Sequence, residues 1–205
     1  MIKLFNEDCL KAMKEMEDGQ FDLAICDPPY GLKRDGHKAD KEYGWKQHQF
    51  KGWDKSRPSK EYFDELRRVS KNQIIWGANY FAEYLPPSKG WIVWDKGQYG
   101  LSMSDCELAF SSFQRATRIY KCNRVQIMLD GSIHPTQKPV ALYMWLLSKY
   151  TKKGWKILDT HLGSGSIAIA CHDMNFDLTA FEIDTGYYEA ALKRLQKHQK
   201  QLKLF

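Results

Sequence analysis

The sequence predicts a three-layer, doubly wound α/β fold with a mainly parallel β-sheet. Short apolar runs alternate with segments of helical periodicity along most of the 205 residues, which is the pattern of such a fold. The length fits a single domain with a substantial core. A content of 43% hydrophobic residues also excludes a disordered chain. We therefore expect one domain over residues 1–205.

The individual elements follow from periodicity and from turn residues. Short apolar runs that end at polar or glycine residues predict strands, and apolar residues at helical spacing predict helices. Ser59 is the expected N-cap of the second helix. The expected strands cover residues 2–6, 21–26, 73–76, 91–94, 106–110, 156–159 and 178–183, and the expected helices cover 9–17, 59–69, 139–149, 164–174 and 185–203.

Composition narrows the class of partner and the compartment. The net charge of +6 favours an anionic partner, although many proteins are this basic. Five cysteines are scattered without a C-x-x-C pair, so neither a zinc site nor a disulfide framework is indicated. No apolar run approaches the roughly 18 residues of a membrane span, and no signal peptide is evident. We expect a cytoplasmic protein without a metal.

The most informative motif is Asp27–Tyr30, with the sequence DPPY. It follows the apolar run 21–26, which reads as a buried strand. An acid, two prolines and an aromatic residue at a strand end make a rigid, acceptor-rich pocket that can hold the exocyclic amino group of a flat base. The alternative is an ordinary strand end, with Asp27 as a turn former and Tyr30 in the core.

A second candidate site is a glycine turn after another strand. Asp159 ends a strand, and Gly163, Ser164 and Gly165 lead into a helix, where glycines allow the backbone to approach a ligand closely. Glu182 follows about 20 residues later, where doubly wound folds place an acid against ribose hydroxyls. Neither G-x-G-x-x-G nor a Walker motif is present, which disfavours a triphosphate or dinucleotide site. The turn therefore predicts an adenosine-containing cofactor; the alternative is two plain strand ends.

Both sites lie at predicted carboxyl ends of strands, so Asp27 and Asp159 are expected to share one crevice. Asp8 either accepts a hydrogen bond from an adenine amino group or caps the first helix. In His134–Pro139, Lys138 is expected to reach a carboxylate, and Thr136 to cap the next helix while its hydroxyl faces the ligand. The alternative for this segment is a proline-flanked helix start.

In their order along the chain, these motifs resemble the beta-type amino methyltransferases of DNA, in which DPPY precedes the glycine turn. The resemblance covers most of the chain, and small phage- and prophage-borne adenine methylases are the most similar subgroup. It implies a Rossmann-like methyltransferase fold with circularly permuted motif order, S-adenosylmethionine as methyl donor and double-stranded DNA as substrate. The motifs that carry it are NEDCL, FDLAICDPPYG, NQIIWGANYF, WIVWDK, HPTQKP and DTHLGSGS.

The resemblance also implies roles for individual residues. One departure is His161, where the family commonly has phenylalanine; an imidazole can replace that ring. The implied catalytic residues are Asp27, Pro28, Pro29 and Tyr30, and the implied cofactor-binding residues are Asp8, Cys9, Thr136, Lys138, Asp159, His161, Gly163, Ser164, Gly165 and Glu182.

The basic and aromatic segment 33–58 is the expected DNA-facing loop, since loops of this length in a compact domain are usually functional or disordered. The alternative is a solvated loop with its aromatic residues pinned to the core. We divide the domain into a catalytic half (1–96), a short target-recognition segment (97–133) and a cofactor-binding half (134–205). The expected DNA contacts are Lys33, Arg34, Lys38, Trp45, Lys46, Lys51, Trp53, Lys55 and Arg57.

An aspartate at position 27 favours transfer to the N6 amine of a flipped adenine. N4-cytosine methylases, which often carry serine there, are the nearest alternative, followed by RNA and protein-glutamine methylases, the latter with asparagine. A non-catalytic nucleic-acid-binding protein and a dinucleotide-dependent oxidoreductase are the alternatives from other classes. A homodimer would let a partner share in reading the DNA sequence.

Overall fold

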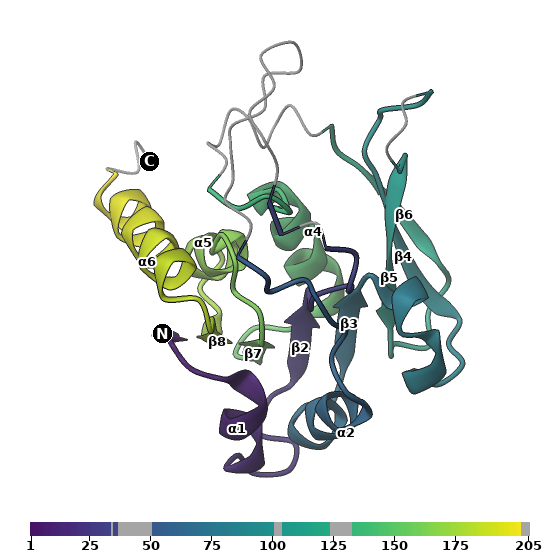
Figure 1. The fold of residues 1–205 in the computed structure, drawn as a ribbon, viewed down its shortest axis with the longest axis horizontal. Helices are drawn as coiled ribbons and strands as arrows, with labels where there is room; N and C mark the ends of the chain where they lie inside the picture. Colours follow the sequence, from purple (N-terminus) through teal and green to yellow (C-terminus); the bar gives the residue numbers. More distant parts are fainter. Residues whose placement is uncertain (34, 37–50, 101–103, 124–132, 202–205) are drawn as a thin grey trace.

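The computed structural model describes residues 1–33, 35–36, 51–100, 104–123 and 133–201. The strands of this part form one sheet in the order β1-β8-β7-β2-β3-β5-β4-β6 (Figure 1). They are β1 (Ile2–Phe5), β2 (Leu23–Cys26), β3 (Gln73–Trp76), β4 (Gly90–Asp95), β5 (Cys106–Ser111), β6 (Arg118–Lys121), β7 (Lys156–Asp159) and β8 (Asp177–Phe181).

Helices cover both faces of the sheet, which confirms the three-layer α/β prediction. Side chains alternate across β2: Leu23 and Ile25 join the core beneath α4, α5 and α6, whereas Ala24 and Cys26 join the core beneath α1 and α2. The helices are α1 (Cys9–Lys14), α2 (Lys60–Val69), α4 (Val140–Tyr150), α5 (Ser166–Asp173) and α6 (Thr185–Lys200), with the 3₁₀ turns η1 (Ala78–Tyr80) and η2 (Ala82–Tyr84).

The sheet is mainly parallel, as predicted, with β5 as the reversed strand. β5 pairs antiparallel with both β3 and β4, and the other described pairs of neighbours are parallel. The chain returns from β4 directly into β5, which only antiparallel pairing allows over so short a connection. As a result, β5 begins at the edge of the sheet where β3 and β4 end.

The structure differs from the expectations at one edge strand and at several element ends. β6 was not predicted, because it is an edge strand with largely exposed side chains and therefore lacks an apolar pattern. The first helix ends at Lys14 instead of residue 17, and the last ends at Lys200. Ser59 does cap α2, because its hydroxyl accepts a hydrogen bond from the Tyr62 amide at 3.4 Å.

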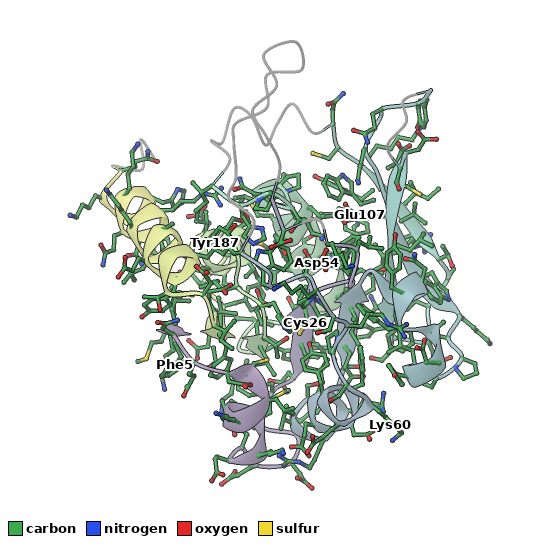
Figure 2. All side chains as sticks on the ribbon, viewed as in Figure 1. Phe5, Cys26, Asp54, Lys60, Glu107 and Tyr187 are labelled. Carbon is green, nitrogen blue, oxygen red and sulfur yellow. The ribbon has the colours of Figure 1, made fainter. Side chains whose placement is uncertain are left out.

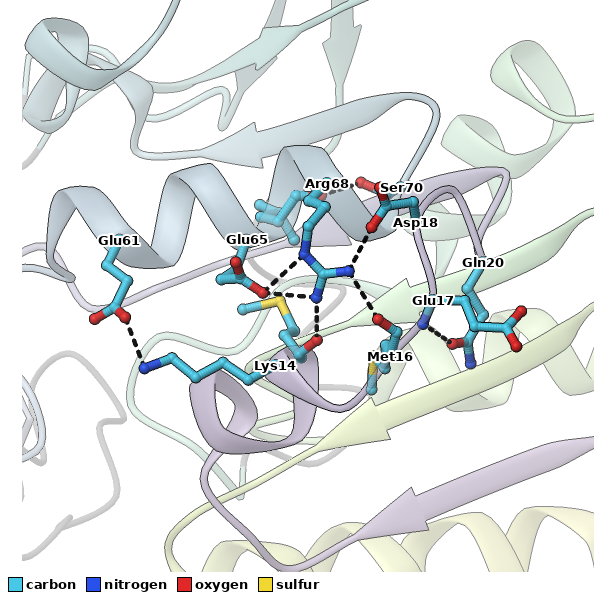
Figure 3. A network of polar contacts seen from close by, with 11 residues as sticks. Lys14, Met16, Glu17, Asp18, Gln20, Glu61, Glu65, Arg68 and Ser70 are labelled. Atoms are coloured by element: carbon cyan, nitrogen blue, oxygen red, sulfur yellow. Dashed lines mark hydrogen bonds and ion pairs between the residues drawn. The ribbon is translucent and has the colours of Figure 1, made fainter.

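Arg68 of α2 holds the segment between α1 and β2 in place (Figure 3). Its guanidinium donates to the carbonyls of Met13 and Met16 at 2.7 Å and pairs with Asp18 and Glu65, each also at 2.7 Å. A planar cation that binds carbonyls at the end of a helix satisfies groups that the helix leaves open. No helix in the described ranges is long and apolar enough to span a membrane.

Candidate active site and cofactor site

The two predicted motifs meet at the centre of the sheet. β2 and β7 are parallel neighbours, and Asp27 directly follows β2 while Asp159 ends β7. β3 lies on one side of β2 and the later strands β7 and β8 on the other, which makes this the topological switch point. Asp27 and Asp159 therefore follow and end neighbouring strands, and burial, helped by the Asp27 charge, raises the pKa of Asp159.

Both oxygens of the Asp27 carboxylate are engaged. The Tyr30 hydroxyl donates to Oδ1 at 2.5 Å, and the Lys138 ammonium donates to Oδ2 at 2.5 Å. Burial raises the pKa of the Asp27 carboxyl, and the Lys138 charge acts against that rise. The side chain retains 15% exposure. Since prolines fix the following turn and carry no N–H, they leave the carboxylate without competing backbone donors.

Gly77 sets the position of Tyr30. The Tyr30 ring stacks on Tyr80 at 5.1 Å between centroids and lies edge-on to Phe81 at 6.0 Å. A Cβ at residue 77 would lie 2.1 Å from the Tyr30 ring, and Gly77 itself has φ +67°, so only glycine fits there. Asp54 holds the turn after Tyr30, because its carboxylate accepts the Gly31 amide at 2.8 Å.

Glu107 and Lys96 belong to the site but were not predicted. Figure 2 labels Glu107 near the start of β5 and Cys26 at the end of β2, both at the edge of the sheet where β3 and β4 end. The Glu107 carboxylate lies 3.0 Å from the Lys138 ammonium and 2.7 Å from that of Lys96. Burial would raise the pKa of Glu107, but the two lysines outweigh it and lower that pKa. Glu107 stands inside the otherwise apolar run of β5, and this isolated charge was the sequence signal that could have indicated its role.

Glu182 organises the glycine turn. Its carboxylate accepts the backbone amides of Gly163 and Asp184, both at 2.9 Å. Gly163 and Gly165 have φ of +51° and +73°, and a Cβ at Gly165 would lie 3.1 Å from Ala191 of α6. Glycine therefore gives the turn both its left-handed backbone and its close approach to α6.

Asp159 is buried and His161 is half-buried, and their pKa values shift in opposite directions. Burial raises the pKa of Asp159 to about 8, although the His161 amide donates to it at 3.0 Å. Burial also lowers the pKa of the His161 imidazole to about 4, so the ring is neutral near pH 7. None of the ion pairs among the described residues includes Asp159. Such a carboxylate fits a cationic ligand, and the acceptor oxygens of Glu182 fit ribose hydroxyls.

The structure shows the local roles of two residues in the smaller motifs. Asp8 caps α1, with its carboxylate accepting the Leu10 amide at 2.8 Å. Thr136 does not cap the following helix: Pro139 is the N-cap of α4, without a side-chain cap bond, and the Thr136 hydroxyl lies 3.1 Å from His134 Nδ1. The helix starts too far along the chain for Thr136 to reach its first amides.

An open pocket of about 220 Å³ connects the two motifs. Its walls come from the start of α1, the DPPY turn, the segment before α2 and the glycine turn. The lining residues are Cys9, Leu10, Pro29, Trp53, Ser56, Arg57, Pro58, Ser59, Tyr62 and His161.

Described residues of the predicted DNA-facing loop contact different parts of the protein. Lys51 pairs with Asp184 at 2.5 Å and lies 4.0 Å from the centre of the Tyr187 ring. Trp53 packs on His134 with ring centroids 5.1 Å apart, and Arg57 pairs with Glu83 at 2.8 Å. Arg34, Lys38, Trp45 and Lys46 lie outside the described residues.

The model of the N6/N4 family, described as DNA methylase, matches residues 74–193. The chain belongs to this family of DNA methylases. The methylase is 25% identical over 244 residues to the type II methyltransferase M.HpaI of Haemophilus parainfluenzae. The aligned region covers 94% of this chain and 74% of that protein. M.HindIII of Haemophilus influenzae is 33% identical over 66 residues, 32% of this chain and 21% of that protein.

Solved structures support the same fold. The structure of M1.HpyAVI in complex with SAM superposes with a TM-score of 0.65 at 19% identity, covering 95% of this chain and all of that one. The PvuII DNA methyltransferase, described as cytosine-N4-specific, superposes with a TM-score of 0.65 at 12% identity. The superposition covers 100% of this chain and 88% of that one. These likenesses show that the chain has the Rossmann-like methyltransferase fold. Its membership of the DNA methylase family gives S-adenosylmethionine as the cofactor and DNA as the substrate.

Proposed function

We propose that this methylase transfers a methyl group to the N6 amine of adenine in double-stranded DNA, with Asp27–Tyr30 as the catalytic segment. The observation that carries the proposal is the Asp27 carboxylate at the switch point between β2 and β7. A carboxylate accepts amine hydrogens more strongly than the serine that N4-cytosine methylases often carry. The fold itself does not separate the two substrates, since the PvuII enzyme is described as cytosine-specific.

The proposed chemistry starts with the amine. Its lone pair is delocalised into the ring, which makes it a poor nucleophile. The Asp27 carboxylate and the Pro28 carbonyl each accept one N6 hydrogen, so that the nitrogen becomes tetrahedral and its lone pair is freed. The preorganised carboxylate then stabilises the positive charge on nitrogen, by several kcal/mol. The methylated amine finally loses one proton to water.

Five residues are proposed to hold the cofactor. Glu182 and Gly163 face its ribose, Asp159 its positive charge, His161 its methionine part and Asp8 its adenine. When bound, S-adenosylmethionine supplies the electrophilic methyl group. The Asp159 carboxylate supports this assignment. It is buried, no ion pair among the described residues neutralises it, and a bound cation would offset the cost of burying its charge.

The target base must leave the duplex to reach Asp27, which costs roughly a few kcal/mol. The half-buried Tyr30 and Trp53 are the proposed aromatic contacts of the flipped base and the vacated stack. Segments 33–58 and 97–133, or a second copy of the chain, read the DNA sequence. Because Asp27 precedes the glycine turn, we infer the permuted, beta-type arrangement of halves 1–96 and 134–205. By resemblance, we place the enzyme among small phage- or prophage-type methylases.

The test is incubation with S-adenosylmethionine and unmethylated mixed-sequence DNA, followed by nucleoside mass analysis. We expect N6-methyladenine, lost in Asp27→Ala and retained in the matched control Asp64→Ala, whose carboxylate lies on the exposed side of α2 and pairs with Lys60 and Arg67. Methylcytosine would overturn the choice of base. No methylated base, despite cofactor binding, would overturn DNA as the substrate of this site.

A further inference from the structure

Asp27, Lys138, Glu107 and Lys96 form a row of alternating charges at the active site. Lys138 is 2.5 Å from Asp27 and 3.0 Å from Glu107, and Lys96 is 2.7 Å from Glu107. Lys138 is almost fully buried, with 2% of its side chain exposed. The reversal of β5 creates the row, because it brings Glu107 to the edge where β4 ends next to Lys96.

This row conflicts with the chemistry proposed for Asp27. Tyr30 and Lys138 each take one acceptor site of the Asp27 carboxylate, on Oδ1 and Oδ2, and the ammonium weakens the remaining sites as acceptors of an amine hydrogen. An ammonium at this distance also opposes the positive charge that develops on the amine during transfer, and it does so strongly in a buried site. A shift of Lys138 away from Asp27 would remove this opposition when the base enters.

Glu107 offers the place to which Lys138 can move. It already touches the ammonium, so a small shift suffices to transfer the ion pair from one carboxylate to the other. The rings of Trp76 and Tyr30 lie 5.3 and 5.9 Å from the ammonium, and aromatic faces tolerate such a displacement because their attraction is weakly directional. Lys96 keeps Glu107 ionised and ready as acceptor.

We infer that Lys138 is a mobile counter-ion, which neutralises Asp27 before the base arrives and moves to Glu107 when the target amine enters. Glu107 and Lys96 are then positioning residues that act through Lys138 and do not touch the base. This inference rests on the proposed function of Asp27, and it holds for an adenine or a cytosine amine alike.

The decisive experiment is a double-mutant cycle of Glu107→Gln and Lys138→Met, measured as single-turnover methylation of unmethylated mixed-sequence DNA. In the wild-type background, Glu107→Gln leaves Lys138 on Asp27, so we expect the rate constant to fall by about tenfold or more with the affinity for S-adenosylmethionine unchanged. In the Lys138→Met background, Glu107→Gln should cost nothing further. Lys138→Met alone should move the acidic limb of the pH–rate profile to higher pH, because Asp27 loses its counter-charge.

Glu65→Gln is the matched control, since Glu65 is also a partly buried carboxylate in an ion pair but lies with Arg68, away from the site. Equal losses from Glu107→Gln in both backgrounds, or full activity of Glu107→Gln, would overturn the inference. A wild-type protein that methylates no base would instead reject the proposed function. These two failures are therefore distinguishable.

Discussion

At the scale of residues, the proposed cofactor site contains a buried carboxyl, Asp159, and a half-buried imidazole, His161, whose pKa values shift in opposite directions. Burial holds Asp159 protonated up to about pH 8 and keeps His161 neutral down to about pH 4. Asp159 faces no ion-pair partner among the described residues, whereas Asp27 has Lys138. Asp159 can therefore pair with a cation that a ligand brings, whereas Asp27 is already paired with the Lys138 ammonium.

The affinity for S-adenosylmethionine should therefore rise with pH. Binding needs ionised Asp159, which is the minor form below its pKa of about 8, so the dissociation constant should fall by about tenfold per unit between pH 6 and 7.5. Titration calorimetry at several pH values measures this slope. Asp159→Asn should bind more weakly and with a much flatter pH dependence; an unchanged slope in that variant would contradict the assignment.

At the scale of elements, irregular pieces place the reacting groups. The reversed strand β5 carries Glu107 to the active edge, and the η1 turn presents Tyr80 to the Tyr30 ring. The left-handed Gly77 ahead of η1 gives that ring its space. The positions of Tyr30 and Glu107 therefore depend on single backbone positions more than on the packing of the core.

Gly77→Ala should displace Tyr30 and reduce methylation by more than about tenfold, because the new Cβ would lie 2.1 Å from the ring. Gly154→Ala is the matched control: Gly154 has φ +84°, and a Cβ at this position would meet none of the described atoms within 4 Å. In both variants the alanine has to adopt a left-handed backbone, which should lower the free energy of unfolding by about 1 kcal/mol in a denaturation experiment. Comparable activity of the two variants would show that Tyr30 tolerates the shift.

At the scale of the whole molecule, two distant parts of the chain complete one crevice. The sheet places β2 beside β7, and Lys51 and Trp53 contact Tyr187 and His134, which lie more than 80 residues further along the chain. S-adenosylmethionine that binds between these segments binds only the folded chain, so binding must raise the free energy of unfolding of the whole domain.

S-adenosylmethionine at about 100 times its dissociation constant should stabilise the fold by about 2.7 kcal/mol and raise the Tm by roughly 5–10 °C. Asp27→Asn should retain this shift, since Asp27 is assigned to the base. Glu182→Gln should lose most of it, because its carboxylate orients the Gly163 amide. Scanning fluorimetry provides the measurement, and a full shift in Glu182→Gln would count against the ribose assignment.

Local sequence patterns were enough to predict the layers of the fold, most of the strands, and the two motifs at neighbouring strand ends. Apolar periodicity and turn residues are local, and the carboxyl ends of parallel strands lie at one edge, so Asp27 and Asp159 could be joined without coordinates. Tertiary structure alone decided the reversal of β5, the edge strand β6 and the ion-pair row of Lys138, Glu107 and Lys96. These depend on pairing between distant segments, which no local pattern encodes.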